Sequence, residues 1–369
     1  MKKIILIISS CITIISCSKS NDDNNNQSTV SGQVITLAGS ETGQGNLDGT
    51  GTAAQFTNLK GICMDTSGNL FVTDDYNNNI RKVTQAGVVT TFAGSTTGEY
   101  GYQDATIGTN AKFNNPSGIC IDTNNNLFVA DYENHCIRKI TPSGSVTTFC
   151  GIAETIADND GTGTTAGFNY PSGICIDNQN IMYITEIIGR VRKVTQTAVV
   201  TTLAGTGLPP FVLAPTQHLD GIGTAARFTT LGTGIVADNL GNLYLSEDLA
   251  YSSIRKIEIA TKKVTTVAGN GEISSLGVPD DGIGTNCKVS ADGICLDAQG
   301  NLMLANYGYI RKLNLSDLKV TTISRNGNAA NLPDGNLNVA GFIFPNGIIF
   351  KNNKFFVAES YRIRILTLN

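Results

Sequence analysis

The sequence predicts an all-β protein, a six-bladed β-propeller of four-stranded antiparallel blades, from three observations. A segment that begins Gly-Ile-Cys-Met-Asp at Gly61 occurs in six versions, 54 to 61 residues apart, along the 369-residue chain. A complete version contains four short apolar runs, rich in β-branched and aromatic residues and separated by turn residues. A repeat of this length cannot bury its apolar faces alone, and four antiparallel strands per repeat describe a propeller blade. The six versions begin at Gly61, Gly118, Gly173, Gly234, Gly293 and Gly347.

The N-terminus carries features of an exported protein. Two lysines precede the apolar run Ile4–Ser16, which is too short to span a bilayer and suits a signal peptide. The run ends in Ile-Ile-Ser followed by Cys17, which resembles the lipobox of bacterial lipoproteins; a plain signal peptide cut nearby is the alternative. We therefore expect a lipoprotein signal peptide over residues 1–16, a lipid on Cys17 and a flexible polar tether over 17–30.

This leader predicts where the protein resides. A lipidated cysteine would hold it at the bacterial cell envelope, at the outer membrane, with the lipid as its sole contact with the bilayer. The Lys and paired Asp after Cys17 resemble an export signal that sends some lipoproteins to the cell surface. The formal net charge of −4 gives no basic footprint for phosphates, so nucleic acid is not an expected partner, and we expect a monomer.

The first repeat shows how one blade is built. Its predicted strands are Gly61–Met64, Leu70–Thr73, Ile80–Val83 and Val88–Ala93, and Gly, Asn and Ser lie at the turns between them. Five repeats follow the same plan.

The sixth repeat is incomplete, which predicts how the ring closes. Residues 346–368 contain three apolar runs, and the chain then ends. The segment Val34–Gly39 near the N-terminus copies the fourth run of the third repeat. We expect it to pair with Ile363–Leu368, so that no blade is left with an open strand edge at the seam. The propeller then spans residues 31–369.

The repeated residues resemble a known family. In the second repeat, Gly-Ile-Cys-Ile-Asp122 is followed by Asn-Leu-Phe-Val-Ala-Asp131, by Asn134 and by Ile-Arg-Lys-Ile140. This pattern resembles the NHL repeat, and the resemblance covers about residues 31–369. It implies the propeller fold, but NHL propellers include binding platforms as well as enzymes, so it leaves the activity open.

Residues present in nearly every repeat are interpreted as structural. Asp65 and its copies precede the first hairpin turn, where a carboxylate can accept backbone N–H groups. Arg81 and its copies are expected to link neighbouring blades by pairing with carboxylates. The Asp-Gly-Thr-Gly loop that starts at Asp48 is expected to be held by Phe56. Blades converge at the axis, where small apolar residues fit, and four cysteines occupy equivalent positions there. Because they lie on different blades, we expect them to form neither a metal cluster nor disulfides. These residues are Cys63, Cys120, Cys175 and Cys295.

Cys136 and Cys150 are a separate case, because both belong to the second repeat. A hairpin turn over Thr141–Ser145 sets a register in which these two residues face each other across adjacent strands. Antiparallel neighbours approach disulfide distance, although the geometry is often strained. The prediction is a disulfide or a close pair of thiols.

Connections in such a meander alternate between two faces, and this locates the expected site. The first-to-second and third-to-fourth turns are short and lie on what we call the tight-turn face. The second-to-third loops and the long loops between blades differ from copy to copy and lie on the variable-loop face. Because variable loops on a rigid scaffold carry function, we expect the site there.

The candidate ligand-binding residues on the variable-loop face fall into three groups. Those in second-to-third loops are Tyr76, Tyr132, His135, Glu186, Glu247, Tyr251, Tyr307 and Tyr361. Those in loops between blades are Tyr100, Tyr102, Phe211 and His218. The residues just before each first strand should ring the axial channel, namely Lys60, Ser117, Ser172, Thr233, Asp292 and Asn346.

Two interpretations of the aromatic residues remain open. Tyrosine offers an apolar face and a hydroxyl group at low entropic cost, which suits glycan or peptide ligands. Alternatively, each tyrosine packs against its neighbour as part of the blade. The proline-stiffened loop that carries Phe211 either packs over the next blade or forms a lip for a partner.

These patterns favour a non-enzymatic binding platform for a glycan or a protein at the cell envelope, without a cofactor. The alternative is a metal-dependent hydrolase, because six-bladed relatives include gluconolactonase-like enzymes with one divalent cation on the axis. Ca²⁺ or a similar ion would there be held by Asp292, Asn346 and either Glu186 or Glu247. The sequence contains two histidines, so a three-histidine zinc site cannot form, and we expect no catalytic residue.

Overall fold

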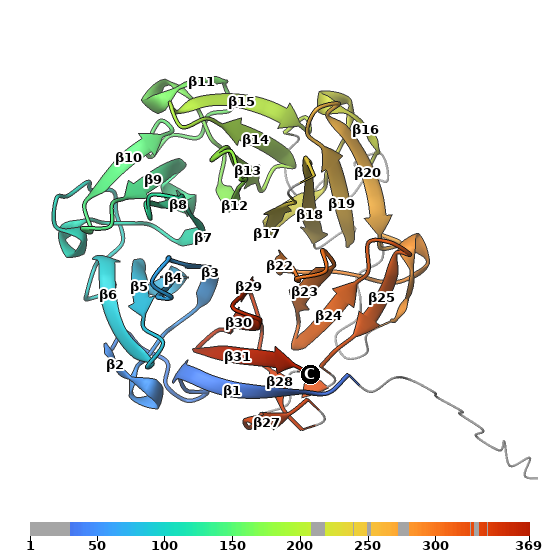
Figure 1. Cartoon of the computed structure of the whole chain (residues 1–369). Helices are drawn as coiled ribbons and strands as arrows, with labels where there is room; N and C mark the ends of the chain where they lie inside the picture. Colours follow the sequence, from blue (N-terminus) through green and yellow to red (C-terminus); the bar gives the residue numbers. More distant parts are fainter. Residues whose placement is uncertain are drawn as a thin grey trace, which may run out of the picture.

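The computed structural model describes residues 30–207, 218–238, 240–248, 252–271, 280–324, 326–327, 332–337 and 339–369. Six antiparallel sheets stand around a central axis like the blades of a propeller (Figure 1). The predicted all-β, six-bladed architecture is confirmed. No helix among the described residues is long and apolar enough to cross a membrane.

Each blade is a meander whose strands follow one another from the axis to the rim. The first blade contains β3 (Leu59–Met64), β4 (Leu70–Asp74), β5 (Asn79–Val83) and β6 (Val88–Gly94). The strands of the other blades are β7 (Pro116–Ile121), β8 (Leu127–Asp131), β9 (Cys136–Ile140) and β10 (Val146–Cys150); β12 (Pro171–Ile176), β13 (Met182–Glu186), β14 (Arg190–Val194) and β15 (Val199–Ala204); β17 (Thr230–Ala237), β18 (Asn242–Asp248), β19 (Ser253–Glu258) and β20 (Lys263–Ala268); β22 (Gly293–Leu296), β23 (Leu302–Asn306), β24 (Tyr309–Leu313) and β25 (Lys319–Thr322); and β29 (Gly347–Lys351), β30 (Lys354–Ala358), β31 (Arg362–Leu368) and β1 (Gly32–Gly39).

The N-terminal strand completes the last blade, as the incomplete sixth repeat predicts. Strand β1 pairs antiparallel with β31, from Gly32 opposite Leu368 to Gly39 opposite Arg362. The chain therefore enters β1 on the tight-turn face, where β31 also ends. Both ends of the propeller lie beside each other at this seam (Figure 1).

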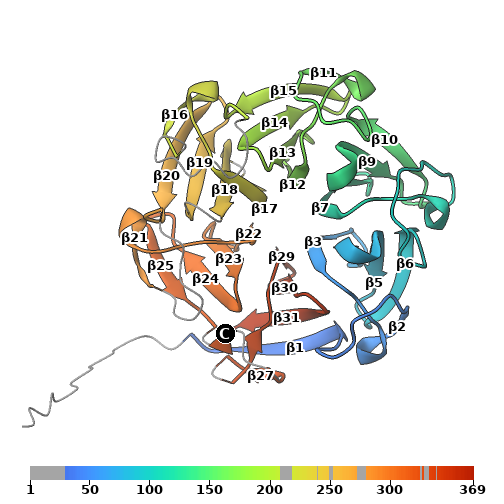
Figure 2. The same ribbon diagram turned by 180° about the vertical axis from the view of Figure 1, so that it is seen from behind.

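Five blades carry one strand more than predicted, a two-residue strand outside the fourth. These outer strands are labelled at the rim in Figure 2. The Asp-Gly-Thr-Gly loop and its looser copies, which share Asp-Gly, form them. In the first blade, Asp48 accepts the backbone N–H and the hydroxyl of Thr91 on β6 and so holds the loop against the blade. The outer strands are β2 (Gly49–Thr50), β11 (Gly161–Thr162), β16 (Gly221–Ile222), β21 (Gly282–Ile283) and β27 (Gly335–Asn336).

The repeated arginine tie is confirmed as an ion pair but acts within one blade. Arg81 is fully buried and its guanidinium lies 2.7 Å from Asp48 and 3.2 Å from Asp74, a carboxylate at the end of β4 of the same blade. Its guanidinium also stacks over Phe56 at 5.2 Å. The prediction of ties between blades was therefore wrong: each arginine anchors the loop that leads into its own blade. The same pairing with an outer aspartate occurs at Arg138, Arg192, Arg255, Arg311 and Arg364.

Contacts between blades are made by the repeated glycine instead. A Cβ atom on Gly118 would lie 2.6 Å from the carbonyl oxygen of Ser172 in the next blade, closer than real Cβ atoms approach. Gly61 and Gly347 meet the next blade in the same way, at Ser117 and Lys60. The innermost strands of adjacent blades can approach this closely only without a side chain.

Side chains of the innermost strands alternate between the two neighbouring blades. Ile62 and Met64 belong to the apolar cluster shared with the last blade, and Cys63 belongs to the cluster shared with the second blade. Six such clusters, one between each pair of adjacent blades, form the core.

Cys136 and Cys150 do not face each other as the hairpin register predicts, and they form no disulfide. The predicted register holds from Val146 opposite Ile140 to Thr148 opposite Arg138, and a bulge at Phe149 then shifts it by one residue. Cys150 consequently lies opposite Ile137, and both thiols are buried and free.

Candidate functional site

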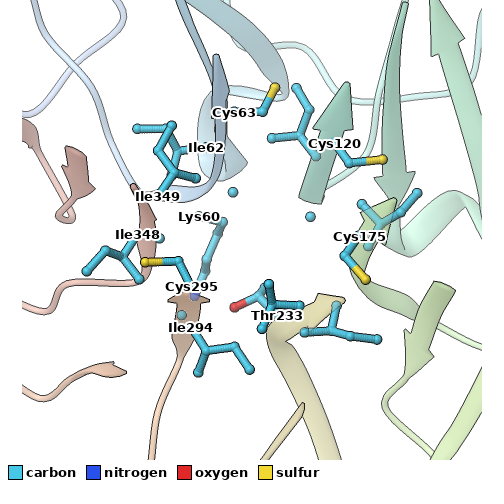
Figure 3. A pocket seen from close by; sticks show the side chains of 18 of the residues that line it. Lys60, Ile62, Cys63, Cys120, Cys175, Thr233, Ile294, Cys295, Ile348 and Ile349 are labelled. Carbon is cyan, nitrogen blue, oxygen red and sulfur yellow. The ribbon is translucent and has the colours of Figure 1, made fainter. Parts of the chain in front are cut away.

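A channel of about 280 Å³ runs along the propeller axis between the innermost strands. Figure 3 shows the cysteine and isoleucine side chains that surround it, with Lys60 among them. Nineteen of the 23 lining residues are Gly, Cys, Met, Val or Ile, and the other four are Lys60, Thr233, Asn346 and Lys351. Each innermost strand is the edge of its sheet, so strand edges face the channel.

The structure brings together half of the predicted axial ring. Lys60, Thr233 and Asn346 line the channel at the variable-loop end, where the innermost strands begin. Ser117 and Ser172 are buried, and the Ser117 carbonyl accepts a hydrogen bond from Thr73. Two members of the ring form side-chain hydrogen bonds to a neighbouring blade. The Thr233 hydroxyl donates to the backbone carbonyl of Asp292 at 2.7 Å, and the Asn346 amide donates to the backbone carbonyl of Leu59 at 2.7 Å.

A wider hollow of about 450 Å³ lies at the tight-turn end of the axis. Its wall includes Asp65, Asp122 and Asp177, together with Lys351. Each aspartate accepts backbone N–H groups of its own turn, as Asp65 does from Ser67 and Asn69, which confirms their structural role. The sequence predicts no site on this face, because residues shared by the copies are interpreted as structural.

The carboxylates Glu186 and Glu247 are buried at the ends of β13 and β18. Glu186 lies 3.3 Å from Arg192, and burial raises its pKa to about 7 although that arginine opposes the shift. Burial also raises the pKa of Glu247, but hydrogen bonding to His218 at 2.8 Å and the charge of Arg255 lower it by more. The pKa of Glu247 therefore lies below the usual value. Both side chains are held within their own blades.

Three of the four donors proposed for an axial cation do not fit such an ion. Glu186 and Glu247 are engaged by buried arginines, and the amide nitrogen of Asn346 points to a carbonyl group. The ammonium group of Lys60 lies at the same end of the channel and would repel a cation. Within the described residues, no group of three or more His, Cys, Asp or Glu side chains is placed to hold a metal ion.

The cysteines beside the channel are buried thiols. Burial raises the pKa of Cys63, Cys120, Cys175 and Cys295 far above the usual value. A thiol acts as a nucleophile through its thiolate, so these side chains are inert near neutral pH.

An aromatic cluster lies on the variable-loop face between the second and third blades. The rings of Tyr132 and Tyr170 are 5.0 Å apart, and Tyr170 meets His135 edge to face at 4.4 Å. The backbone N–H of Tyr170 donates to Nδ1 of His135 at 3.3 Å, and burial lowers the pKa of this histidine. Burial also raises the pKa of Tyr132 to about 12, so its hydroxyl group stays protonated.

Two exposed tyrosines lie at the same side of this face. Tyr76 and Tyr100 have exposed fractions of 62% and 72%. Their loops are joined by Asn78, whose side chain donates to the carbonyls of Tyr76 and Gly98. Asn115 donates its side-chain amide to Asp75 and its backbone N–H to the side chain of Asn78, which links these loops to the second blade. We call Tyr76, Tyr100, Tyr132, His135 and Tyr170 the aromatic patch.

The other predicted residues are placed elsewhere or lie outside the described ranges. Tyr102 stacks on Arg138 at 4.9 Å and bonds Thr148 through its hydroxyl group, so it packs on the blade. Tyr307 and Tyr361 are half-buried on the fifth and sixth blades. Phe211 and Tyr251 lie outside the described residues.

Tyr170 is the member of the patch that the sequence interpretation missed. It precedes Pro171 where the other repeats with this proline have Asn115 and Phe344. Comparison of the copies at this position, which varies before the shared proline, would have revealed it.

Comparison with known proteins supports the family resemblance and the fold. The family model described as NHL repeat matches residues 113–140, which lie in the second blade. The NHL repeat-containing protein 2 of Bos taurus is 26% identical over 295 residues, which cover 70% of this chain and 39% of that protein. The chain thus spans well under half the length of this relative.

Solved structures of similar shape have low sequence identity and support the propeller fold alone. A protein of unknown function from Bacteroides thetaiotaomicron has a TM-score of 0.67 at 18% identity, with 92% of this chain and 76% of that chain covered. An auxiliary nutrient binding protein from Bacteroides ovatus has a TM-score of 0.65 at 14% identity, with 92% and 77% covered. A gluconolactonase from Xanthomonas campestris has a TM-score of 0.56 at 12% identity, with 92% and 90% covered.

Proposed function

We propose that this protein is a non-enzymatic binding propeller that holds glycans on its variable-loop face through the aromatic patch. The observation that carries the proposal is that two exposed tyrosines, Tyr76 and Tyr100, lie on the same face as the half-buried pair of Tyr132 and Tyr170. A binding role is also in keeping with the nutrient-binding propeller from Bacteroides ovatus.

The chemistry of the patch suits a sugar ring. Tyrosine side chains cover the apolar face of a ligand while the hydroxyl groups bond its polar edge. The cluster of Tyr132, His135 and Tyr170 is fixed by ring contacts and by a backbone hydrogen bond, so little entropy is lost when a ligand binds. The nearby side chains of Asp75 and Glu133 favour a neutral sugar over an acidic one at this patch.

The hydrolase alternative has less support from the same residues. A hydrolase of the gluconolactonase type needs a cation or a catalytic acid–base group at the axis. The acids suited to that role, Glu186 and Glu247, instead complete the arginine pairs that hold each blade. A group committed to the scaffold in this way does not reach a ligand to exchange a proton with it.

We further propose that the protein is anchored through a lipid on Cys17, with residues 17–30 as its tether. Strand β1 starts on the tight-turn face, beside the end of β31. A tether that enters there would turn the tight-turn face toward the membrane. The aromatic patch on the opposite face would then point away from the bilayer, where glycans are accessible.

A glycan array tests the proposal. Wild type should bind a restricted set of neutral glycans, and the double variant Tyr76→Ala/Tyr100→Ala should bind them at least about tenfold more weakly, because stacking area is lost. Tyr307→Ala changes a tyrosine in the second-to-third loop of the fifth blade and serves as the matched control, with unchanged binding. An array on which wild type binds no glycan, or on which the double variant binds as well as wild type, would contradict the proposal.

A further inference from the structure

The axial channel has polar walls despite its apolar side chains, because strand edges face it. Asp65 N–H donates to the Asn69 carbonyl at the end of the first hairpin. Bonded and unbonded pairs alternate along an antiparallel ladder, so the backbone groups of Met64 and Ile62 point away from β4. Among the described residues, strand β3 has no partner strand on that side, and these N–H and C=O groups therefore point into the channel.

The same register recurs around the axis. Backbone bonds equivalent to that of Asp65 are made by Asp122, Asp177, Asp238 and Asp297. The channel is thus ringed by inward N–H and C=O groups, at Ile62, Ile119, Ile174, Ile235 and Ile294, all of which line it. Such groups need hydrogen-bonding partners, and an apolar occupant would remove water from them at a cost. A hydroxylated occupant could replace that water.

Lys60 supplies charge at one end of this channel, and no hydrogen bond or ion pair found among the described residues uses its side chain. Its position holds Ser, Ser, Thr, Asp and Asn in the other repeats. The contact with the neighbouring blade at Gly347 is made by the carbonyl oxygen of Lys60, not by its ammonium group. The described residues that line the channel include no Asp or Glu side chain to pair with it. Asp75 lies within electrostatic reach, where Lys60 offsets part of the rise that burial gives to the pKa of that carboxyl.

The second lysine of the channel is in a different setting. Lys351 lies at the tight-turn end and shares its hollow with Asp65, Asp122 and Asp177. An anion entering from that side meets carboxylates, whereas one entering from the variable-loop face meets Lys60. The two ends therefore differ in charge, and the end at Lys60 is the one that attracts an anion.

We propose that the axial channel is a second ligand site, which binds one small hydroxylated carboxylic acid with its carboxylate on the ammonium of Lys60. The volume of about 280 Å³ is at the small end for ligand pockets, which suits one molecule of monosaccharide size. Hydroxyl groups would bond the inward backbone groups. Thr233 and Asn346, whose side chains donate to backbone carbonyls, line the channel at the same end as Lys60. This site is separate from the aromatic patch.

Calorimetry with three probes of similar size tests this site, using D-glucuronate, D-glucose and hexanoate. Wild type should bind glucuronate at least about tenfold more tightly than glucose, because a charge-assisted bond contributes about 1.5–3 kcal/mol. Hexanoate, which has the charge without the hydroxyl groups, should also bind more weakly than glucuronate. The Lys60→Met variant should lose the preference for glucuronate over glucose, and Lys351→Met should keep it.

Circular dichroism would show that both lysine variants are folded. The double variant Tyr76→Ala/Tyr100→Ala should retain glucuronate binding, which separates this site from the aromatic patch. The proposal is overturned if wild type does not bind glucuronate, if Lys60→Met discriminates as well as wild type, or if hexanoate binds as tightly as glucuronate.

Discussion

At the scale of single residues, comparison between repeats separates scaffold from site. The glycine that opens each innermost strand is shared because a Cβ atom there would overlap the next blade. The residue one position earlier contributes only its backbone to that contact, so its side chain is free to differ. In the first repeat this position is Lys60, which places an ammonium group in the channel.

The glycine contact predicts a measurable cost. Gly118→Ala should lower the free energy of unfolding by about 1–3 kcal/mol, because the new methyl group would lie 2.6 Å from Ser172 O and force the blades apart. Gly232→Ala is the matched control, because nothing lies within 4 Å of the position that its Cβ would take and its backbone is not left-handed. Urea unfolding followed by circular dichroism measures both. Equal stability of the two variants would refute the close-approach explanation.

The residues also show where prediction from sequence ends. The positions of the turn aspartates and of the phenylalanine-held loops follow from their repetition. The register that keeps Cys136 and Cys150 from facing each other does not, because it depends on a bulge at Phe149 that no composition signal marks. The burial of Glu186 and Glu247 was missed for another reason: their acidic positions in variable loops resemble a site, and only the arginine partners show their role.

At the scale of elements, one strand from the N-terminus holds the ring closed. Val34 and Ala38 of β1 are fully buried in two different interblade clusters. Asp334 also bonds the backbone and hydroxyl group of Thr36, so the outer loop of the last blade depends on β1. The seam is therefore maintained by side-chain packing as well as by strand pairing.

Removal of this strand should open the seam. A chain that begins at Ser40 should melt at a lower temperature and aggregate, since β31 becomes an exposed edge. A chain that begins at Ser31 retains β1 and should melt like the full-length protein. A synthetic peptide of residues 31–40 added to the shorter chain should restore part of the melting temperature. The closure account fails if the chains beginning at Ser31 and Ser40 melt together.

At the scale of the whole molecule, the fold could be predicted from the sequence because the same pattern of four strands recurs in each repeat. The sequence could not give the fifth, outer strand of a blade, which arises from a long-range bond such as that of Asp48 to Thr91. The contact between Tyr170 and Tyr132 could not be predicted either, because it joins loops of two different blades. Convergence between blades depends on loop paths, and these are the parts that the repeats do not share.

The central claim is that shared residues build the blades, whereas the ligand binds where the copies differ. Hydrogen–deuterium exchange with and without a glycan that binds on the array measures this most directly. We expect slower exchange in peptides containing Tyr76, Tyr100, residues 132–135 and Tyr170, with the tight turns at 65–69 unchanged. Protection confined to the tight turns, with none at the aromatic patch, would contradict the account.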